Sequence, residues 1–123
     1  MTIDDTGKDL VRRHIDLSWN KADFDALDAV WSDEAVVHLW DGGTLTGLQE
    51  LKEHLRASVL AWTDRLCEIE ELVAEGDFIA NRWSFRGADP TGDRWTMSGM
   101  DFYRVSDGKL FEEWIALGTP AKG

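Results

Sequence analysis

The sequence predicts a single α+β domain spanning residues 1–123, with helices packed on one face of an antiparallel β-sheet. Helical periodicity is confined to the first half of the chain, and strand-like alternation fills the second half. The alternating segments follow one another through short turns, which is typical of antiparallel pairing. Helices followed by strands therefore favour an α+β domain over repeated βαβ units.

Three helices and one strand are predicted in the first half. Residues 24–31 form a short helix that Asp23 can cap, and residues 34–40 alternate as a first strand. Residues 41–47 form a loop, and leucines mark an amphipathic helix over residues 48–62. The first helix is indicated by residues that recur at helical spacing: Leu10, Val11, His14, Ile15 and Ser18.

Four strands are predicted in the second half, near residues 65–74, 78–86, 93–105 and 109–117. Glu75-Gly76-Asp77 and Asp107-Gly108 are turn signals, and the segment around Pro90 supplies the middle loop. Consecutive strands joined in this way predict an antiparallel meander.

Charge and cysteine content narrow the classes of partner. The chain carries 24 acidic and 13 basic residues, for a net charge of -11, which disfavours binding to nucleic acid or to anionic membranes. A single cysteine, Cys67, cannot form an internal disulfide and is compatible with a reducing cytoplasm. The sequence contains neither a signal peptide nor an apolar run of membrane-spanning length, so we expect a cytoplasmic location.

Each of four predicted strand faces is apolar except for one polar side chain: His38, Asn81, Asp101 and Glu113. Burying an unpaired polar group costs about 2 kcal/mol or more, so each exception needs a reason. His38 could be a core histidine, Asn81 could satisfy backbone groups, and Glu113 could be solvated at a strand end. Asp101 lies mid-strand among aromatic neighbours and is the strongest candidate for a pocket residue.

The hairpin around Asp107-Gly108 predicts which side chains face one another. One register places Arg104 opposite Glu112, a favourable charge pair, and Asp101 opposite Ile115. It also places Tyr103 opposite Glu113. A slip of one residue would instead pair Asp101 with Trp114 and move Glu113 to the other face. The charge pair favours the first register.

Three segments carry a family resemblance that covers nearly the whole chain: "VRRHIDLSWNKADFDALDAVWSDEAVVH", "ELVAEGDFIANRWSFRG" and "PTGDRWTMSGMDFYRVSDGKLFEEW". They resemble the SnoaL-like polyketide cyclases of the nuclear transport factor 2-like superfamily, whose cousins include limonene epoxide hydrolases and ketosteroid isomerases. The resemblance implies a curved antiparallel sheet wrapped around N-terminal helices, a cone-shaped, cystatin-like α+β barrel with an apolar pocket. Such a scaffold hosts unrelated chemistries as well as inactive binders.

Two positions depart from the family pattern. Cyclases carry a catalytic aspartate directly after the Trp of the last-strand motif, where this chain has Ile115 after Trp114. They carry a site histidine three residues before the motif Arg, where this chain has Asp101 before Arg104. His38 matches a histidine that many relatives carry at the end of the first strand.

The leading hypothesis is acid/base chemistry, without metal or cofactor, on a small hydrophobic polyketide-, steroid- or terpene-like ligand. Cyclase, isomerase and epoxide-hydrolase reactions are all compatible with it. One rival is a non-catalytic ligand-binding or accessory protein, and another is a structural role with the open sheet face forming a homodimer. We expect Asp101 and His38 to be catalytic and the following residues to bind substrate: Trp40, Trp62, Asn81, Trp83, Tyr103, Glu113 and Ile115.

Overall fold

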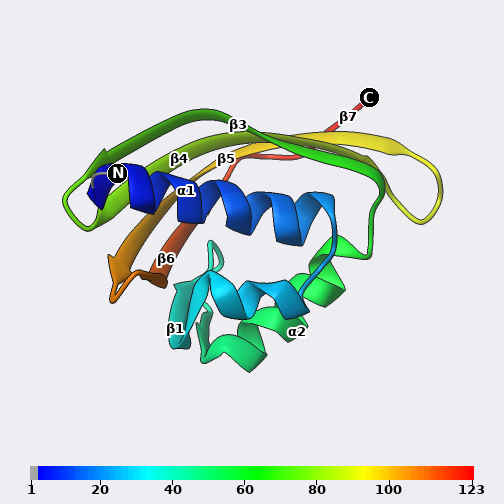
Figure 1. Ribbon diagram of the computed structural model, residues 1–123. Helices are drawn as coiled ribbons and strands as arrows, with labels where there is room; N and C mark the ends of the chain where they lie inside the picture. Colours follow the sequence, from blue (N-terminus) through cyan, green and yellow to red (C-terminus); the bar gives the residue numbers. More distant parts are fainter. Residues whose placement is uncertain (1–2) are drawn as a thin grey trace.

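The computed structural model describes residues 3–123, and its long curved sheet arches over the first helix (Figure 1). The helical elements are α1 (Ile3–Ile15), the π-helical turn η1 (Asp16–Asn20), the 3₁₀-helix η2 (Asp25–Ala29) and α2 (Leu48–Val59). The strands are β1 (Trp31–His38), β2 (Thr44–Thr46), β3 (Thr63–Glu75), β4 (Phe78–Ala88), β5 (Arg94–Ser106), β6 (Lys109–Leu117) and β7 (Ala121–Lys122). The predicted α+β cone is confirmed.

The strands form one sheet in the order β2-β1-β6-β5-β4-β3, with β7 added against β5. All pairs are antiparallel except β1 and β6, which run parallel, so the expectation of a wholly antiparallel sheet was wrong. Strands β3 to β6 are joined by turns that impose antiparallel pairing. No such turn links β1 to β6, because α2 and four strands separate them in the chain, and local patterns could not reveal their direction.

The predicted register of the β5–β6 hairpin is confirmed: Asp101 pairs with Ile115, Tyr103 with Glu113 and Arg104 with Glu112. The register shifts between Arg104 and Val105, which pairs with Leu110. Both turn residues, Asp107 and Gly108, have positive φ angles of 52° and 74°, the conformation of a tight two-residue hairpin turn. The irregularity leaves one extra residue on β6 and sends the Glu113 side chain to the same face as Asp101.

Local predictions in the first half need smaller corrections. The helix expected over residues 24–31 shortens to η2, and the fully buried Trp31 begins β1 instead. Residues 44–46 of the expected loop form the edge strand β2, which pairs with Val36–His38. The helix expected over residues 48–62 ends at Val59. Among residues 3–123, no helix is both long enough and apolar enough to span a membrane.

The core lies between the helices and the concave face of the sheet. Leu10 and Val11 of α1 pack with Leu51 and Leu55 of α2 and with Tyr103 of β5 in the main cluster. A second cluster at the end of α1 contains Ile15, Cys67, Trp83 and Phe85. The gap between α2 and the β4–β6 strands is only partly filled by these clusters, and this is where the cavity lies.

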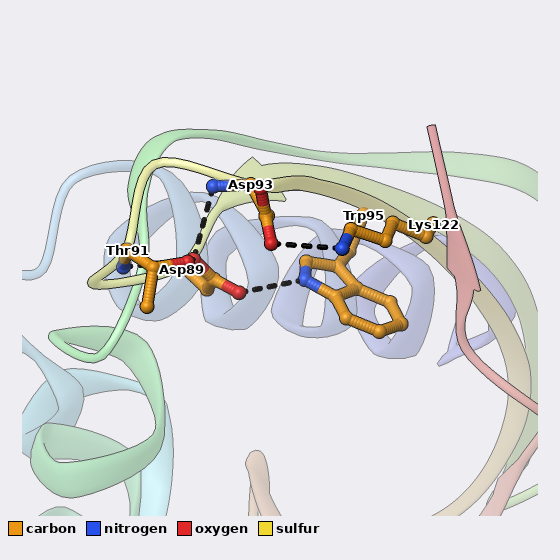
Figure 2. Close-up of polar contacts among 5 residues, drawn as sticks. All are labelled: Asp89, Thr91, Asp93, Trp95 and Lys122. Carbon is orange, nitrogen blue, oxygen red and sulfur yellow. Dashed lines mark hydrogen bonds and ion pairs between the residues drawn. The ribbon is translucent and has the colours of Figure 1, made fainter.

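The loop between β4 and β5 is organised by one carboxylate. Asp89 accepts hydrogen bonds from the backbone N–H groups of Thr91 and Asp93 at 2.9 and 3.0 Å and from the Trp95 indole at 2.8 Å (Figure 2). These bonds and the Thr91 hydroxyl lower the Asp89 pKa to about 2. Lys122 of β7 contacts Asp93 at 2.9 Å, which ties the C-terminal segment to the same loop. These contacts join the β4–β5 loop to the C-terminal segment, and residues 89–93 do not line the cavity described below.

Candidate functional site

A cavity of about 340 Å³ lies between the helices and the concave face of the sheet. Its wall comes from the end of α1, from η1, from one face of α2 and from strands β3 to β6, and most of the lining is apolar or aromatic. The size and polarity are those of a site for a small hydrophobic molecule. The few polar groups in the wall determine which reactions the site can support.

Two carboxyl groups from neighbouring strands meet in the wall. Asp101 of β5 is 7% exposed and Glu113 of β6 is 3% exposed, and both line the cavity. The register places Asp101 opposite Ile115 and Glu113 opposite Tyr103, so the two acids are diagonal neighbours on one face of the hairpin. In these positions each acid affects the ionisation of the other.

Burial raises the pKa of both acids. For Glu113 the shift is large, because desolvation and the negative charge of Asp101 both oppose its ionisation. Desolvation also raises the pKa of Asp101, and the hydrogen bond from the Tyr103 hydroxyl partly opposes that rise. Because burial raises both pKa values, and the charge of Asp101 raises that of Glu113 further, the two carboxyl groups resist ionising together in this apolar site.

Tyr103 stabilises the acid pair through a hydrogen bond to Asp101, and it lies outside the cavity wall. Its side chain is fully buried, and its hydroxyl donates to Asp101 Oδ2 at 3.1 Å. Burial and the two nearby acids raise the Tyr103 pKa well above its ordinary value, so the phenol stays protonated and remains a donor. The other Asp101 oxygen, Oδ1, is sealed from solvent and accepts no hydrogen bond within residues 3–123. A protonated Glu113 is the donor that such an oxygen requires.

His14 of α1 also lines the cavity. The Trp31 indole N–H donates to His14 Nδ1 at 3.0 Å, and burial lowers the His14 pKa to about 4. The helix widens into the π-helical turn η1 just after His14, and the Ser18 hydroxyl donates to the His14 carbonyl at 2.5 Å. At neutral pH the imidazole is therefore uncharged, and the Trp31 indole holds it at Nδ1.

The mouth of the cavity is formed by α2 and the segment after β1. Trp40, half exposed, lies 6.4 Å from the His54 ring, and the Ser58 hydroxyl is 3.5 Å from His54 Nε2. Desolvation lowers the His54 pKa, with partial opposition from the charge of Asp41. Trp62, which follows α2, packs edge-on against Phe85 and forms part of the cavity wall.

Cys67 of β3 lines the cavity, but burial and the charges of Asp101 and Glu68 raise its pKa to about 12. The thiol is therefore protonated and a poor nucleophile. Among residues 3–123, no group of three or more His, Cys, Asp or Glu side chains is arranged to hold a metal ion.

Most of the predicted site residues reach this cavity. Tyr103 lies behind Asp101 rather than in the wall. His38 and Asn81 are not part of the wall. The predicted residues that do line the cavity are Trp40, Trp62, Trp83, Asp101, Glu113 and Ile115.

His38, predicted to be catalytic with Asp101, lies on the other face of the sheet and does not join Asp101 in the cavity wall. On β1 the buried positions are Ala35 and Val37, which turns His38 outwards. There it pairs with Glu112 at 2.7 Å and stacks on Trp114 with ring centroids 5.2 Å apart. The β-branched run in β1 made both faces look apolar, so alternation could not tell which one faced the core.

Asn81 of β4 is fully buried beside Asp101, its partner across the strands. Neither its amide nitrogen nor its amide oxygen has a hydrogen-bond partner within residues 3–123. It therefore lies next to the site without entering the cavity.

Sequence reasoning did not select His14 or His54. His14 is the polar member of the apolar stripe of α1, the same signal that identified Asn81, Asp101 and Glu113 on strands. That rule was applied to strands alone. His54 lies at the edge of the α2 apolar stripe, next to Leu55, where a polar residue is ordinary.

A curved, open sheet that arches over a helix and encloses an apolar cavity is the α+β cone of the nuclear transport factor 2-like superfamily. Within it, the SnoaL-like domain family matches residues 11–113, so the chain belongs to the SnoaL-like family. No curated protein sequence matches the chain significantly.

Solved structures share the fold. A Jannaschia sp. CCS1 protein, provisionally assigned as a SnoaL-like polyketide cyclase, has a TM-score of 0.86 at 15% identity, over 95% of this chain and 88% of that one. An epoxide hydrolase of the limonene epoxide hydrolase-like type from M. tuberculosis has a TM-score of 0.78 at 17% identity, over 93% and 84%. A nuclear transport factor 2-like protein of unknown function from Exiguobacterium sp. 255-15 has a TM-score of 0.73 at 26% identity, over 95% and 98%.

Proposed function

We propose that this protein catalyses proton transfer on a small hydrophobic ligand, with the Asp101–Glu113 carboxyl pair as its acid/base machinery. The observation that carries the proposal is the pairing of two buried acids, both with raised pKa values, in the wall of an apolar cavity. Paired carboxyl groups in such surroundings provide a base and an acid at the same pH.

Each acid has a definite role. Asp101, ionised and supported by the Tyr103 hydroxyl, accepts a proton from a carbon next to a carbonyl, so the C–H bond breaks and an enolate-like oxygen gains charge. Glu113, protonated, supplies a hydrogen bond or its proton to that oxygen. When Glu113 gives up its proton to that oxygen, the pair keeps one negative charge, now on Glu113, and reversal of the two proton transfers returns it to its starting state without any redox step. The same groups can activate water at an epoxide.

The Asp101–Glu113 pair accounts for the departure from the family pattern, in which Ile115 replaces the family's aspartate. The family's acid position is Ile115, which is apolar and lines the cavity. Glu113 projects from the same strand and on the same face, two residues earlier. Relocation of the second acid by two residues along β6 preserves a carboxyl group on this wall.

The experiment is α-proton exchange of 2-acetylnaphthalene in D₂O, followed by loss of the methyl ¹H NMR signal. We expect the wild-type protein to accelerate exchange and Asp101→Asn to lose about a hundredfold or more of that acceleration. Glu113→Gln should also slow exchange, because an amide cannot give up a proton to the enolate oxygen. Glu112→Gln, one residue away on the opposite face, is the matched control and should retain it.

Two outcomes would contradict the proposal. Exchange that survives in both Asp101→Asn and Glu113→Gln would exclude the pair from the chemistry. Tight binding of the ketone by the wild-type protein without any acceleration of exchange would instead support the alternative, a non-catalytic ligand-binding or accessory protein. The mostly apolar cavity, with Ile115 at the family's acid position, favours that alternative as the second candidate.

We also propose that the protein forms a homodimer through the outer face of the sheet. This face exposes large apolar side chains on β5 and β6, with Met100 at 61%, Phe102 at 43% and Trp114 at 37% exposure. An apolar cluster of this kind is typical of an interface. Met100→Lys combined with Phe102→Lys should convert a dimer to a monomer in analytical ultracentrifugation, and a wild-type monomer would refute the proposal.

A further inference from the structure

The cavity contains a histidine whose role neither the acid pair nor the family pattern accounts for. His14 projects from α1 on the helical side of the cavity, whereas Asp101 and Glu113 project from the sheet. It is 3% exposed and surrounded by aromatic rings, with Trp31 at 5.3 Å and Tyr103 at 6.0 Å between centroids. A buried histidine in such a position needs a partner for each ring nitrogen.

The tautomer of His14 follows from its contact with Trp31. An indole N–H can only donate, so His14 Nδ1, at 3.0 Å from it, must be the unprotonated, accepting nitrogen. The imidazole is neutral at physiological pH because burial lowers its pKa to about 4. A neutral imidazole with a bare Nδ1 carries its single proton on Nε2. Trp31 thus makes Nε2–H a fixed donor.

Nothing within residues 3–123 accepts a hydrogen bond from this donor. The polar contacts of the His14 side chain in that part of the chain consist of the Trp31 bond alone. Nε2 is also absent from the sealed, unpartnered side-chain atoms, which belong to Asn81, Trp83, Asp101 and Arg104. His14 Nε2 is therefore unpaired but still accessible. Because His14 lines the cavity, this nitrogen is open to the cavity.

We infer that His14 Nε2–H is the hydrogen-bond donor that binds a ligand oxygen, and that the ligand is an apolar molecule carrying a carbonyl or similar acceptor oxygen. The inference rests on the proposed function for its chemical setting and adds the substrate class and a binding residue. A neutral donor suits this position, because an imidazolium would pay a large desolvation cost in an apolar cavity. The neutral imidazole can also stabilise negative charge that develops on the ligand oxygen without placing a full positive charge in the cavity.

The test compares binding of two probes of the same shape, 2-acetylnaphthalene and 2-ethylnaphthalene, by isothermal titration calorimetry. The wild-type protein should prefer the ketone by roughly two- to tenfold, the range of one net hydrogen bond. In the double variant His14→Phe/Trp31→Phe the ketone preference should disappear. Because both partners become apolar, this variant leaves no indole donor unpaired, and unchanged affinity for 2-ethylnaphthalene reports an intact cavity.

Histidine ¹⁵N NMR gives a second readout that a purely structural histidine would not share. The wild-type spectrum should show His14 as the Nε2–H tautomer at pH 7, and 2-acetylnaphthalene, but not 2-ethylnaphthalene, should shift its Nε2–H resonance. Trp31→Phe should release the tautomer and weaken ketone binding alone. A Nδ1–H tautomer, an unmoved resonance, or a ketone preference that persists in the double variant would each overturn the inference.

These outcomes are separable from the fate of the acid pair. Loss of proton exchange in Asp101→Asn together with a ketone preference independent of His14 would retain the proposed function and reject the inference. A preference that depends on His14 in a protein that catalyses no exchange would retain the inference for a binding protein.

Discussion

Glu113→Gln should change the pH dependence of stability in a way that reports the protonated state of the pair. Glutamine matches the shape of protonated glutamic acid and can donate to Asp101, so the native packing should be kept. In the wild-type protein, burial and the Asp101 charge raise the Glu113 pKa well above its ordinary value of 4.5. The folded protein therefore binds a proton that the unfolded chain releases above pH 4.5.

The sign follows from this difference in bound protons. Stability contributed by a raised carboxyl pKa is fully present below the unfolded pKa and is lost as pH rises towards the folded pKa. The loss amounts to about 1.4 kcal/mol per pH unit while Glu113 stays protonated in the folded state. The free energy of unfolding of Glu113→Gln relative to wild type should thus increase by about 1.4 kcal/mol from pH 5.5 to pH 6.5.

Urea denaturation followed by tryptophan fluorescence measures this difference. With an m-value of about 1–3 kcal/mol/M, the midpoint of the variant should move by roughly 0.5–1.4 M relative to wild type over that pH unit. Titrating groups that do not interact with Glu113, including His14, behave alike in both proteins and cancel. Asp101→Asn should reduce the slope in part, because it removes one of the charges that raise the Glu113 pKa. Parallel pH profiles for wild type and Glu113→Gln would refute a buried, protonated Glu113.

Three further predictions concern the surroundings of the pair. Gly99→Ala should destabilise the protein by about 1–3 kcal/mol in chemical denaturation, because the new Cβ would lie 2.5 Å from Trp83 Cζ2. Tyr103→Phe removes the 3.1 Å hydrogen bond to Asp101, which should raise the Asp101 pKa further and move the acid limb of the exchange–pH profile to higher pH. His14, neutral in the fold with a pKa of about 4 against 6.5 unfolded, should cost stability as pH falls from 6.5 to about 4. His14→Gln should remove about 3 kcal/mol of that acid-side loss, as measured by urea denaturation at the two pH values.

The inward positions of β4 to β6 were predictable because they alternate strictly. Asn81, Asp101 and Glu113 each interrupt an otherwise apolar face, and the Arg104–Glu112 charge pair selected the hairpin register. Alternation of period two and a two-residue turn leave little freedom in such a meander. Strand β1 offered no such guide, and its parallel pairing with β6 and the outward orientation of His38 were not predictable.

By itself the sequence determined the fold class, the family and the acids that share one strand face, since these depend on periodicity, turn residues and local charge pairs. Only the tertiary structure decided which groups meet in the cavity. It placed His14 of a helix opposite Asp101 and Glu113 of the sheet, and it placed His38 on the other side of β1. The physical reason is that the hydrophobic pattern of a sequence describes one helix or strand at a time. The packing of α1 and α2 against the concave sheet determines which polar side chains lose water together, and hence which pKa values shift.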